Sequence, residues 1–132
     1  MISRIDHIVL TVEDVSRSVT FYTRVLGMLE VSFGAGRTAL GFGQQKINLH
    51  QKGHEFEPKA SSPTPGSADL CFVADVHLDA VISRLQENGI KIIEGPVERT
   101  GACGQILSVY FRDPDSNLIE VSTYLEESNE RA

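Results

Sequence analysis

The chain has 132 residues, of which 41% are hydrophobic and 23% are charged, and its formal net charge is −6. This length fits one domain, residues 1–132, that buries about two thirds of the surface exposed by the unfolded chain. The 12 basic residues are scattered, so we expect no nucleic-acid partner, because phosphate neutralisation requires clustered Lys and Arg. No apolar run approaches the ~20 residues of a membrane span, and no signal-peptide pattern or disulfide framework is present. We therefore expect a cytoplasmic protein without a membrane partner.

The first half of the sequence predicts one strand, one helix and three further strands. Residues 5–12 alternate as in a half-buried strand, which places His7 on a mixed face with Val9 and Thr11. Ile8, Leu10 and Val12 form the opposite, apolar face, which is expected to pack against a helix. The helix begins after Asp14 or Ser16, either of which can cap it, and it ends at Gly27. Three short strands are expected to follow at residues 29–33, 38–42 and 46–51.

Residues 52–67, KGHEFEPKASSPTPGS, interrupt this pattern, because three prolines with Ser and Gly indicate an irregular linker. After the linker the order of elements begins again, and Asp69 precedes Gly89 by the same interval that separates His7 from Gly27. The second half is expected to contain strands at 68–76, 91–95, 105–111 and 118–122, a helix at 77–89, a loop at 96–104 and a polar tail at 125–132.

The chain therefore reads as a tandem repeat of two β-α-β-β-β modules, at residues 4–51 and 68–124, of the α+β class. Each module alone is too small to cover both faces of a curved sheet. Pairing the modules, or pairing two chains, would enclose a cleft.

Four side chains that can bind a metal fall at matching positions of the repeat. His7 and Asp69 lie on the first strand of each module, and His50 and Glu120 lie on the last. An acid in the middle of an apolar strand, as in NLIEVS, is costly to bury unless it is paired or binds a metal. Two imidazoles and two carboxylates suit a divalent ion such as Zn²⁺, Ni²⁺, Mn²⁺ or Fe²⁺.

Each of these residues also has an ordinary structural interpretation. His7 taken alone is more often a satisfied strand residue than a ligand, Glu120 can pair with a lysine across strands, and His50 can end a strand in solvent. Cys71 lies in an apolar strand and is expected in the core, whereas Cys103, in a glycine-rich loop, is expected at the surface. The metal hypothesis depends on the coincidence of four positions in a repeated fold.

Two segments carry a resemblance to a known superfamily: IDHIVLTVEDVSRSVTFYTRVLGM near the start and VYFRDPDSNLIEVS near the end. With them the chain resembles the vicinal oxygen chelate superfamily of glyoxalases, fosfomycin-resistance proteins and extradiol dioxygenases. The resemblance runs through Tyr124 and is closest to glyoxalase-domain-containing proteins, some of them bacterial and described as virulence-associated. It implies the glyoxalase-like fold, in which two tandem βαβββ modules form a curved open-barrel sheet that encloses a cleft.

The resemblance implies a partly altered ligand set. The first-strand metal histidine of the superfamily matches His7, and the last-strand metal glutamate matches Glu120. The fifth-strand histidine of glyoxalases and dioxygenases falls on Asp69, and the glutamate that glyoxalase I uses as base and ligand falls near Asn48. His50, on the face of Asn48, can supply the lost imidazole, and Asp69 would then be a fourth ligand, a base, or a partner that orients a histidine.

The resemblance implies a divalent-metal-dependent enzyme that chelates two adjacent oxygens of a small molecule, with Asp69 or Glu120 as the catalytic base. The first hypothesis is a lactoylglutathione-lyase-type lyase or isomerase that acts on a small dicarbonyl or thiol adduct, such as a glutathione adduct. The second is a thiol transferase or ring-opening enzyme of the fosfomycin-resistance type, against which the lack of a basic cluster counts. The third is a metal-free protein that sequesters a drug or metabolite. A homodimer is also implied, because superfamily members of this length pair their modules across chains.

Overall fold

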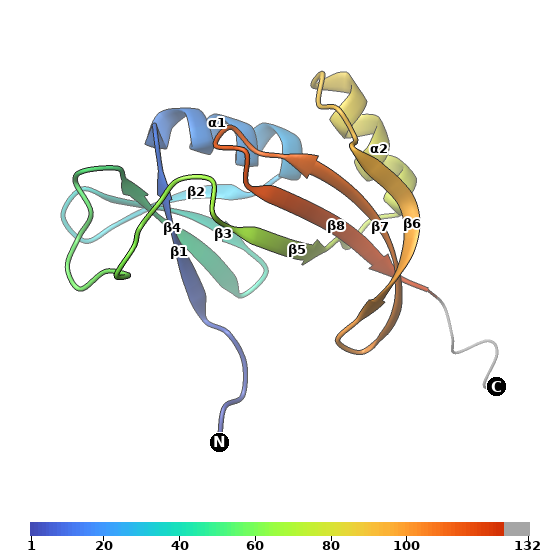
Figure 1. Cartoon of the computed structure of the whole chain (residues 1–132), viewed down its shortest axis with the longest axis horizontal. Coiled ribbons are helices and arrows are strands. Elements are labelled where there is room, and N and C mark those ends of the chain that lie inside the picture. Colours follow the sequence, from blue (N-terminus) through green and yellow to red (C-terminus); the bar gives the residue numbers. More distant parts are fainter. Residues whose placement is uncertain (126–132) are drawn as a thin grey trace. The chain divides into compact units, whose positions relative to one another are not determined.

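The computed structural model describes residues 1–125, and the rest of the predicted polar tail lies outside the described residues. The predicted order of elements occurs twice (Figure 1). The first set comprises β1 (His7–Val12), α1 (Val15–Leu26), β2 (Leu29–Phe33), β3 (Arg37–Phe42) and β4 (Gln45–Gln51). The second set comprises β5 (Asp69–Val73), α2 (Leu78–Glu87), β6 (Glu94–Gly101), β7 (Gly104–Arg112) and β8 (Leu118–Tyr124).

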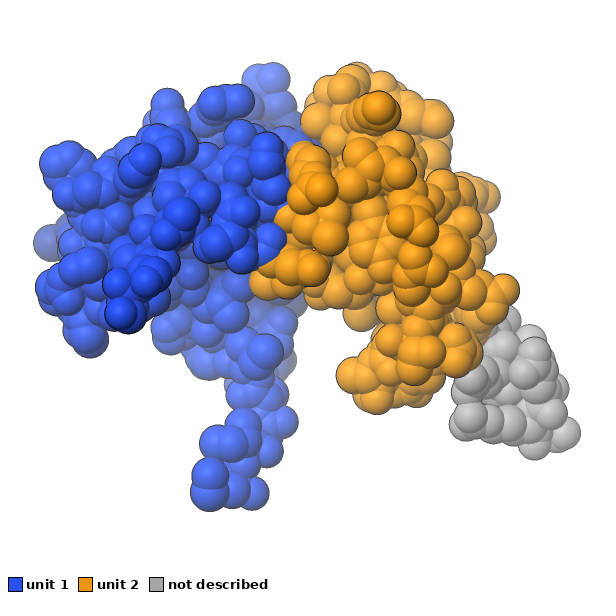
Figure 2. Space-filling view, in the orientation of Figure 1, with its two compact units in different colours: residues 1–68, 113–117 blue, residues 69–112, 118–132 orange. Residues whose placement is uncertain are grey.

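Each set of elements folds into an open, four-stranded mixed sheet. The strand orders are β1-β4-β3-β2 and β5-β8-β7-β6, with the first and last strands of each set parallel and the other neighbours antiparallel. The predicted α+β class with two βαβββ modules is confirmed. Two compact units result, coloured separately in Figure 2: unit 1 comprises residues 1–68 and 113–117, and unit 2 comprises residues 69–112 and the chain from Leu118 onward.

In unit 1, α1 covers one face of the sheet. Asp14 caps the helix by accepting a hydrogen bond from the N–H of Arg17 at 3.2 Å, and Gly27 ends it in the left-handed conformation with φ 69°. Strand alternation places Ile8, Leu10 and Val12 on the face opposite to His7, as the sequence predicts. The buried residues of this layer are Val19, Tyr22 and Val25 of α1 and Leu10, Val12, Leu40, Ile47 and Leu49 of the strands.

The turn at residues 113–117 belongs to unit 1 and centres on the buried carboxylate of Asp113. Its Oδ1 accepts hydrogen bonds from the N–H groups of Asp115 and Asn117, each at 2.9 Å. Its Oδ2 accepts from the side-chain amide of Asn117 at 2.8 Å and from the hydroxyl of Tyr22 at 2.5 Å. The amide oxygen of Asn117 in turn accepts from the N–H of Ala68 at 2.8 Å. The DPDSN segment, which carries much of the resemblance, therefore has a structural role.

In unit 2, α2 packs on β7 and β8 through buried Leu78 and Leu85. His77 caps this helix, because its Nδ1 accepts a hydrogen bond from the N–H of Asp79 at 3.1 Å. Within residues 1–125, no helix is both long and apolar enough to cross a membrane. The sheet residues buried in this unit include Ile106, Val109, Phe111, Ile119 and Val121.

The edge strand β6 corrects two expectations, a strand at 91–95 and a loop at 96–104. The strand starts only at Glu94 and continues to Gly101, so most of the expected loop is paired with β7. The pairing register shifts between Glu94 and Val97, and this bulge accommodates Pro96, which lacks an N–H donor. Gly95 is required there, because its φ is 107° and a Cβ would lie 2.3 Å from the carbonyl oxygen of Ser108.

Candidate functional site

His7 begins β1 and is partly exposed on the face of the sheet that α1 leaves uncovered. Its Nδ1 lies 2.8 Å from Oδ1 of Asp6, and this hydrogen bond is the main cause of the lowered pKa of the Asp6 carboxyl. A carboxylate at Nδ1 favours the tautomer with its proton on that nitrogen, which leaves a lone pair on Nε2. Metal-binding histidines are commonly held in this way, so the geometry is compatible with the predicted role.

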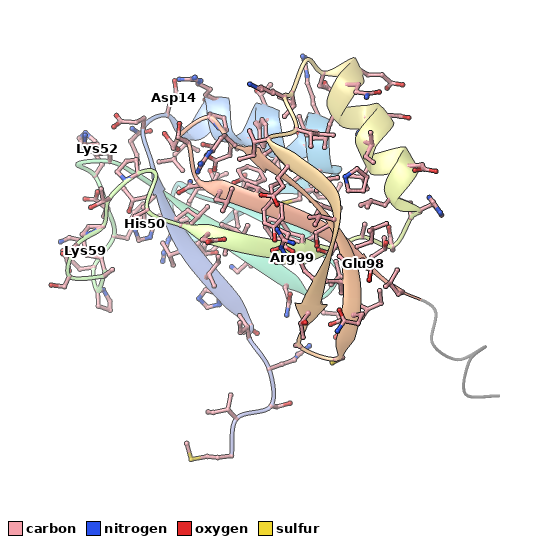
Figure 3. The ribbon with its side chains drawn as sticks, turned by 45° about the vertical axis from the view of Figure 1, so that its right-hand side comes forward. Asp14, His50, Lys52, Lys59, Glu98 and Arg99 are labelled. Carbon is pink, nitrogen blue, oxygen red and sulfur yellow. The ribbon has the colours of Figure 1, made fainter. Side chains whose placement is uncertain are left out.

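His50 lies buried on β4, where Figure 3 labels it, and its polar contact is a cation. Its Nε2 lies 3.4 Å from Nη2 of Arg37, and its ring meets that of Phe56 edge-on with centroids 5.5 Å apart. Burial, and then the charge of Arg37, lowers the pKa of His50. The imidazole is therefore neutral near pH 7, and its Nε2 accepts from the guanidinium.

The two histidines share a sheet face but are not neighbours. His7 pairs with Lys46 and His50 pairs with Thr11, so four residues separate them along the strands, about 13 Å at the usual rise. Within residues 1–125, no three His, Cys, Asp or Glu side chains form a cluster suited to a metal ion. Two of the four predicted ligands lie in each unit. The complete set of His7, His50, Asp69 and Glu120 stays a prediction.

Glu120 lies half-buried on β8, between the buried residues Ile119 and Val121, as strand alternation predicts. Its Oε2 accepts a hydrogen bond from the hydroxyl of Ser108 at 2.6 Å, and the hydroxyl of Ser122 lies 3.4 Å away. The two serine hydroxyls are 2.6 Å apart, and both residues are fully buried. Hydroxyl groups, rather than the lysine considered from the sequence, therefore hold this carboxylate.

Cys71 is not a core residue, which corrects the expectation from the sequence. It is exposed on β5 directly beside Glu120, and its Sγ lies 3.3 Å from the hydroxyl of Ser122. Its surroundings raise the pKa of the thiol, chiefly by desolvation, so it is protonated near pH 7. Cys103 is exposed as predicted. A pocket of about 430 Å³ in unit 2 is lined by Cys71, Arg99, Ile106, Tyr110, Glu120 and Tyr124.

Arg99 and Tyr110 join this pocket from β6 and β7, and sequence reasoning missed both. Nε of Arg99 donates to the hydroxyl of Tyr110 at 3.1 Å, and Nη2 donates to Glu94 at 2.7 Å. Figure 3 labels Arg99 and its neighbour Glu98 on this strand. Desolvation raises the pKa of Tyr110, although the bond from Arg99 opposes the shift. The sequence predicted a loop at 96–104, and without a strand there Arg99 had no defined sheet face and no expected contact with Tyr110.

Asp69 is the exposed first residue of β5. It pairs with Leu118, while Cys71 pairs with Glu120, so Asp69 lies on the face of Glu120, one alternation step along the sheet. That step is about 7 Å. Unit 2 thus presents both predicted carboxylates on the sheet face that α2 leaves uncovered.

Unit 1 has a larger pocket, of about 620 Å³. It is lined by residues 8–11 of β1, by His50, by Asn117 and by parts of the segment 58–68. Part of the segment 52–67, predicted as an irregular linker, therefore lines a pocket within this unit. His50 contacts both the pocket and Arg37.

Two βαβββ modules, with a histidine on the first strand of one and a glutamate on the last strand of the other, define a recognisable class of protein. The chain belongs to the Glyoxalase/Bleomycin resistance protein/Dioxygenase superfamily, whose family model matches residues 4–121. The resemblance stated from the sequence is confirmed. Members of this superfamily typically use divalent metal ions, bind small molecules and often form dimers.

The chain is 60% identical over 125 residues to virulence protein STM3117 of Salmonella typhimurium (strain LT2), covering 95% of this chain and 87% of that protein. The crystal structure of that relative superposes with a TM-score of 0.93 and covers 95% of this chain and 99% of its own. The chain is also 61% identical over 120 residues to glyoxalase domain-containing protein RDO1 of Mycosarcoma maydis, covering 91% and 68% of the two chains.

Two more distant relatives are named for their enzymatic activities. Metallothiol transferase FosB of Shouchella clausii is 30% identical over 131 residues, covering 93% of this chain and 82% of that protein. The crystal structure of lactoylglutathione lyase from Agrobacterium tumefaciens superposes with a TM-score of 0.71 at 25% identity, covering 93% and 95%. The chain is thus similar to enzymes of two different reactions within one superfamily.

Proposed function

We propose that the protein is a divalent-metal-dependent enzyme of the lactoylglutathione-lyase type that acts on a small dicarbonyl or thiol adduct, such as a glutathione adduct. The proposal rests on one arrangement that is found in both units: a candidate metal ligand whose side chain is held by a hydrogen bond from or to a neighbouring side chain. His7 is hydrogen-bonded to Asp6, and Glu120 is hydrogen-bonded to Ser108. Partners of this kind orient metal ligands and raise their affinity. The similarity to the Agrobacterium lyase supports this type of reaction.

The donor set fits a borderline divalent ion, because imidazole and carboxylate groups suit Zn²⁺, Ni²⁺, Mn²⁺ and Fe²⁺. We assign His7 and Glu120 as ligands. Asp69, on the face of Glu120, is the third ligand or the base. His50 is the weakest of the four, because its Nε2 accepts from Arg37 and a cation there disfavours a second positive charge.

When bound, the ion supplies a Lewis acid that stabilises negative charge on two neighbouring substrate oxygens. The residues of the chain do the rest. Asn48 stands near the position of the glyoxalase I glutamate and cannot take up a proton, so the exposed carboxylate of Asp69 moves the proton between adjacent carbons. Ser108 and Ser122 keep the carboxylate of Glu120 in one orientation.

A second candidate is a thiol transferase or ring-opening enzyme of the fosfomycin-resistance type. The similarity to metallothiol transferase FosB favours it. The structure also removes one objection, because Arg37 and Lys46, distant enough in sequence to show no cluster, meet at the ring of Phe33. The third hypothesis, a metal-free sequestering protein, requires no oriented ligands at His7 and Glu120.

Metal content tests the proposal most directly. Protein purified without chelators is analysed for bound metals, and Zn²⁺, Ni²⁺ and Mn²⁺ are titrated by calorimetry. We expect Glu120→Gln to weaken binding by about 100-fold or more, because a ligand is lost. The matched control is Glu98→Gln, since Glu98 is exposed and pairs with Leu107 on the other face of the sheet. No bound ion and no binding of added metal would exclude both enzyme hypotheses.

His7 provides an independent arm of the same experiment. His7→Gln is expected to weaken metal binding about as strongly as Glu120→Gln, since both remove a ligand. His54→Gln is the control, because His54 is also exposed in unit 1 but lies outside the strands. Equal affinities for the two histidine variants would contradict the assignment of His7.

Activity separates the two enzyme hypotheses. The metal-loaded protein is assayed for isomerisation of the hemithioacetal of a dicarbonyl with glutathione, and for thiol transfer to an epoxide. Asp69→Asn is expected to lower kcat by about 100-fold while metal affinity changes less, because a general base contributes about 10²–10⁴-fold. Asp75→Asn, at an exposed residue after β5, is the control. Full kcat in Asp69→Asn would rule out Asp69 as the base.

We also propose that the protein is a homodimer, as superfamily members often are. Sedimentation velocity of the intact chain is expected to show a species of twice the 14.5 kDa chain mass. A monomer at micromolar concentration would contradict this part of the proposal alone.

A further inference from the structure

Two positive side chains meet at one aromatic ring on the uncovered face of unit 1. Nζ of Lys46, on β4, lies 3.7 Å from the centroid of the Phe33 ring, and Cζ of Arg37, on β3, lies 5.1 Å from the same centroid. The guanidinium of Arg37 also lies 4.7 Å from the centroid of Phe56. The aromatic rings hold the two cations in place without neutralising them.

Among the described residues 1–125, neither Arg37 nor Lys46 forms a salt bridge. The charge of Lys46 is the smallest of the causes that lower the pKa of the Asp6 carboxyl. Oδ1 of Asp6 is hydrogen-bonded to His7 instead. The polar partner of Arg37 is the imidazole of His50, not a carboxylate. Both positive charges lie beside the ring of Phe33, at 5.1 and 3.7 Å from its centroid, so this face favours an anion. Lys52, Lys59 and Arg99, by contrast, each form a salt bridge with a glutamate.

A buried hydrogen-bond acceptor without a partner lies on the same face. Asn48, which follows Lys46 by two residues on β4, is 5% exposed, and no group in the described part of the chain forms a hydrogen bond with its Oδ1. Its neighbour on β3 is the small, fully buried residue Ala39. Buried polar atoms are nearly always paired, so an unpaired one points to a group that the protein itself does not supply. A ligand with an N–H or O–H donor beside its charge would satisfy this oxygen.

We propose that Arg37, Lys46 and Asn48 form a subsite for a small oxyanion, a carboxylate or phosphoryl group, that bears a hydroxyl or amino group on the adjoining atom. The guanidinium binds the anion through directed N–H donors, and the ammonium acts as a point charge. Asn48 accepts a hydrogen bond from the adjoining hydroxyl or amino group. This proposal rests on the proposed function in one respect, since the oxyanion is taken as the charged end of the substrate.

The test uses chelator-treated full-length protein, so that no metal contributes to binding. Glycolate, acetate and inorganic phosphate are titrated separately while the amide signals are followed by ¹⁵N NMR. Glycolate has a hydroxyl beside its carboxylate, whereas acetate does not. We expect glycolate to shift the side-chain amide of Asn48 and the backbone amides of β3 and β4, and to bind about tenfold more tightly than acetate. Tighter binding of phosphate than of glycolate would assign the phosphoryl class, and the reverse would assign the carboxylate class.

Charge-removing variants localise the site. Arg37→Gln and Lys46→Gln are each expected to weaken glycolate binding about tenfold or more, because a charge-assisted contact is lost. Lys46→Arg keeps the charge and is expected to retain binding. The matched control is Lys52→Gln, since Lys52 is in the same unit but is already paired with Glu13. The amide spectrum of each variant reports whether it is folded.

Three results would overturn the proposal: shifts that map away from β3 and β4, binding that survives both charge removals, or equal losses in Lys52→Gln. Equal binding of acetate and glycolate would remove Asn48 from the subsite. Because Glu120 is in unit 2, the variant Glu120→Gln is expected to bind glycolate as the wild type does and to lose affinity for the metal ion. Failure of the oxyanion subsite and failure of the metal proposal are therefore seen separately.

Discussion

The two units repeat one order of elements, yet the sheet faces that their helices leave uncovered differ in chemistry. Unit 1 presents the cations Arg37 and Lys46 around Phe33. Unit 2 presents the carboxylate of Glu120, held by the hydroxyl of Ser108 and flanked by the thiol of Cys71. The repeat preserves strand order and helix position, while the residues on the uncovered faces have specialised. Function in such a repeat has to be argued face by face and not from the fold.

A second contrast lies within the segment VYFRDPDSNLIEVS, between Asp113 and Glu120. Asp113, in unit 1, accepts four hydrogen bonds and is buried. Glu120, in unit 2, is half-buried and lines a pocket. Two acids seven residues apart in one motif therefore have different roles, a structural one and a proposed chemical one. Substitutions that separate stability from metal binding test this division.

Asp113→Ala has the largest expected effect. Removing the carboxylate leaves the buried Tyr22 hydroxyl and the Asn117 amide without an acceptor, which is expected to lower the free energy of unfolding by about 3–5 kcal/mol. Urea denaturation measures this change. Asp75→Ala, at an exposed residue, is the control and is expected to stay within about 0.5 kcal/mol of the wild type. A loss of under 1 kcal/mol in Asp113→Ala would contradict the structural role.

Gly95→Ala tests the bulge that makes β6 a strand and brings Arg99 to the pocket. The added Cβ would lie 2.3 Å from a backbone oxygen at a φ of 107°, so a loss of about 2–4 kcal/mol in unfolding free energy is expected. The control is Gly36→Ala, where φ is 69° and nothing lies within 4 Å, so that only the conformational cost of about 1 kcal/mol applies. Equal losses in these two variants would show that the close contact with β7 has no effect.

Ser108→Ala acts on the proposed chemistry through Glu120. Without the 2.6 Å hydrogen bond the carboxylate has more freedom, and metal affinity is expected to fall about 10- to 100-fold. Calorimetric titration of Zn²⁺ measures the effect. Ser83→Ala, an exposed serine in the middle of α2, serves as the control. Unchanged affinity in Ser108→Ala would show that Ser108 does not position a metal ligand.

Local patterns predicted most of the fold because they depend on neighbours in sequence. The alternation of β1, the cap at Asp14 and the left-handed Gly27 all followed from short-range rules. Cys71 escaped these rules, because DLCFV is apolar on both sides after its first residue and only pairing with Glu120 shows which face the thiol takes. The strand β6 was missed because Gly95 and Pro96 resemble a turn unless a bulge is foreseen.

The site was predicted less completely, since contacts across strands depend on register and sheet curvature. The positions of His7 and Glu120 followed from the superfamily resemblance, but their partners Asp6 and Ser108 did not. Lys46 reaches Phe33 across the intervening strand β3, and this contact has no signal in the sequence. Contacts between neighbouring strands, such as that of Ser108 with Glu120, were the main part of the site that patterns could not show.

The substitution His50→Gln is expected to change stability least, but its result decides whether His50 belongs to the metal-ligand set. Its pKa is lowered in the folded protein, first by burial and then by Arg37, so the unfolded chain binds a proton more readily. The stability contributed by the neutral imidazole is therefore present above about pH 6.5 and is lost as pH falls toward the folded pKa. We compare chelator-treated wild type and His50→Gln. Between about pH 7.5 and pH 5, the unfolding free energy of His50→Gln is expected to fall less steeply than that of the wild type. Lys52→Gln, a charge change elsewhere in unit 1, is expected to keep the wild-type slope. Equal slopes for the wild type and His50→Gln, together with weaker Zn²⁺ binding by the variant, would instead make His50 a ligand that turns away from Arg37.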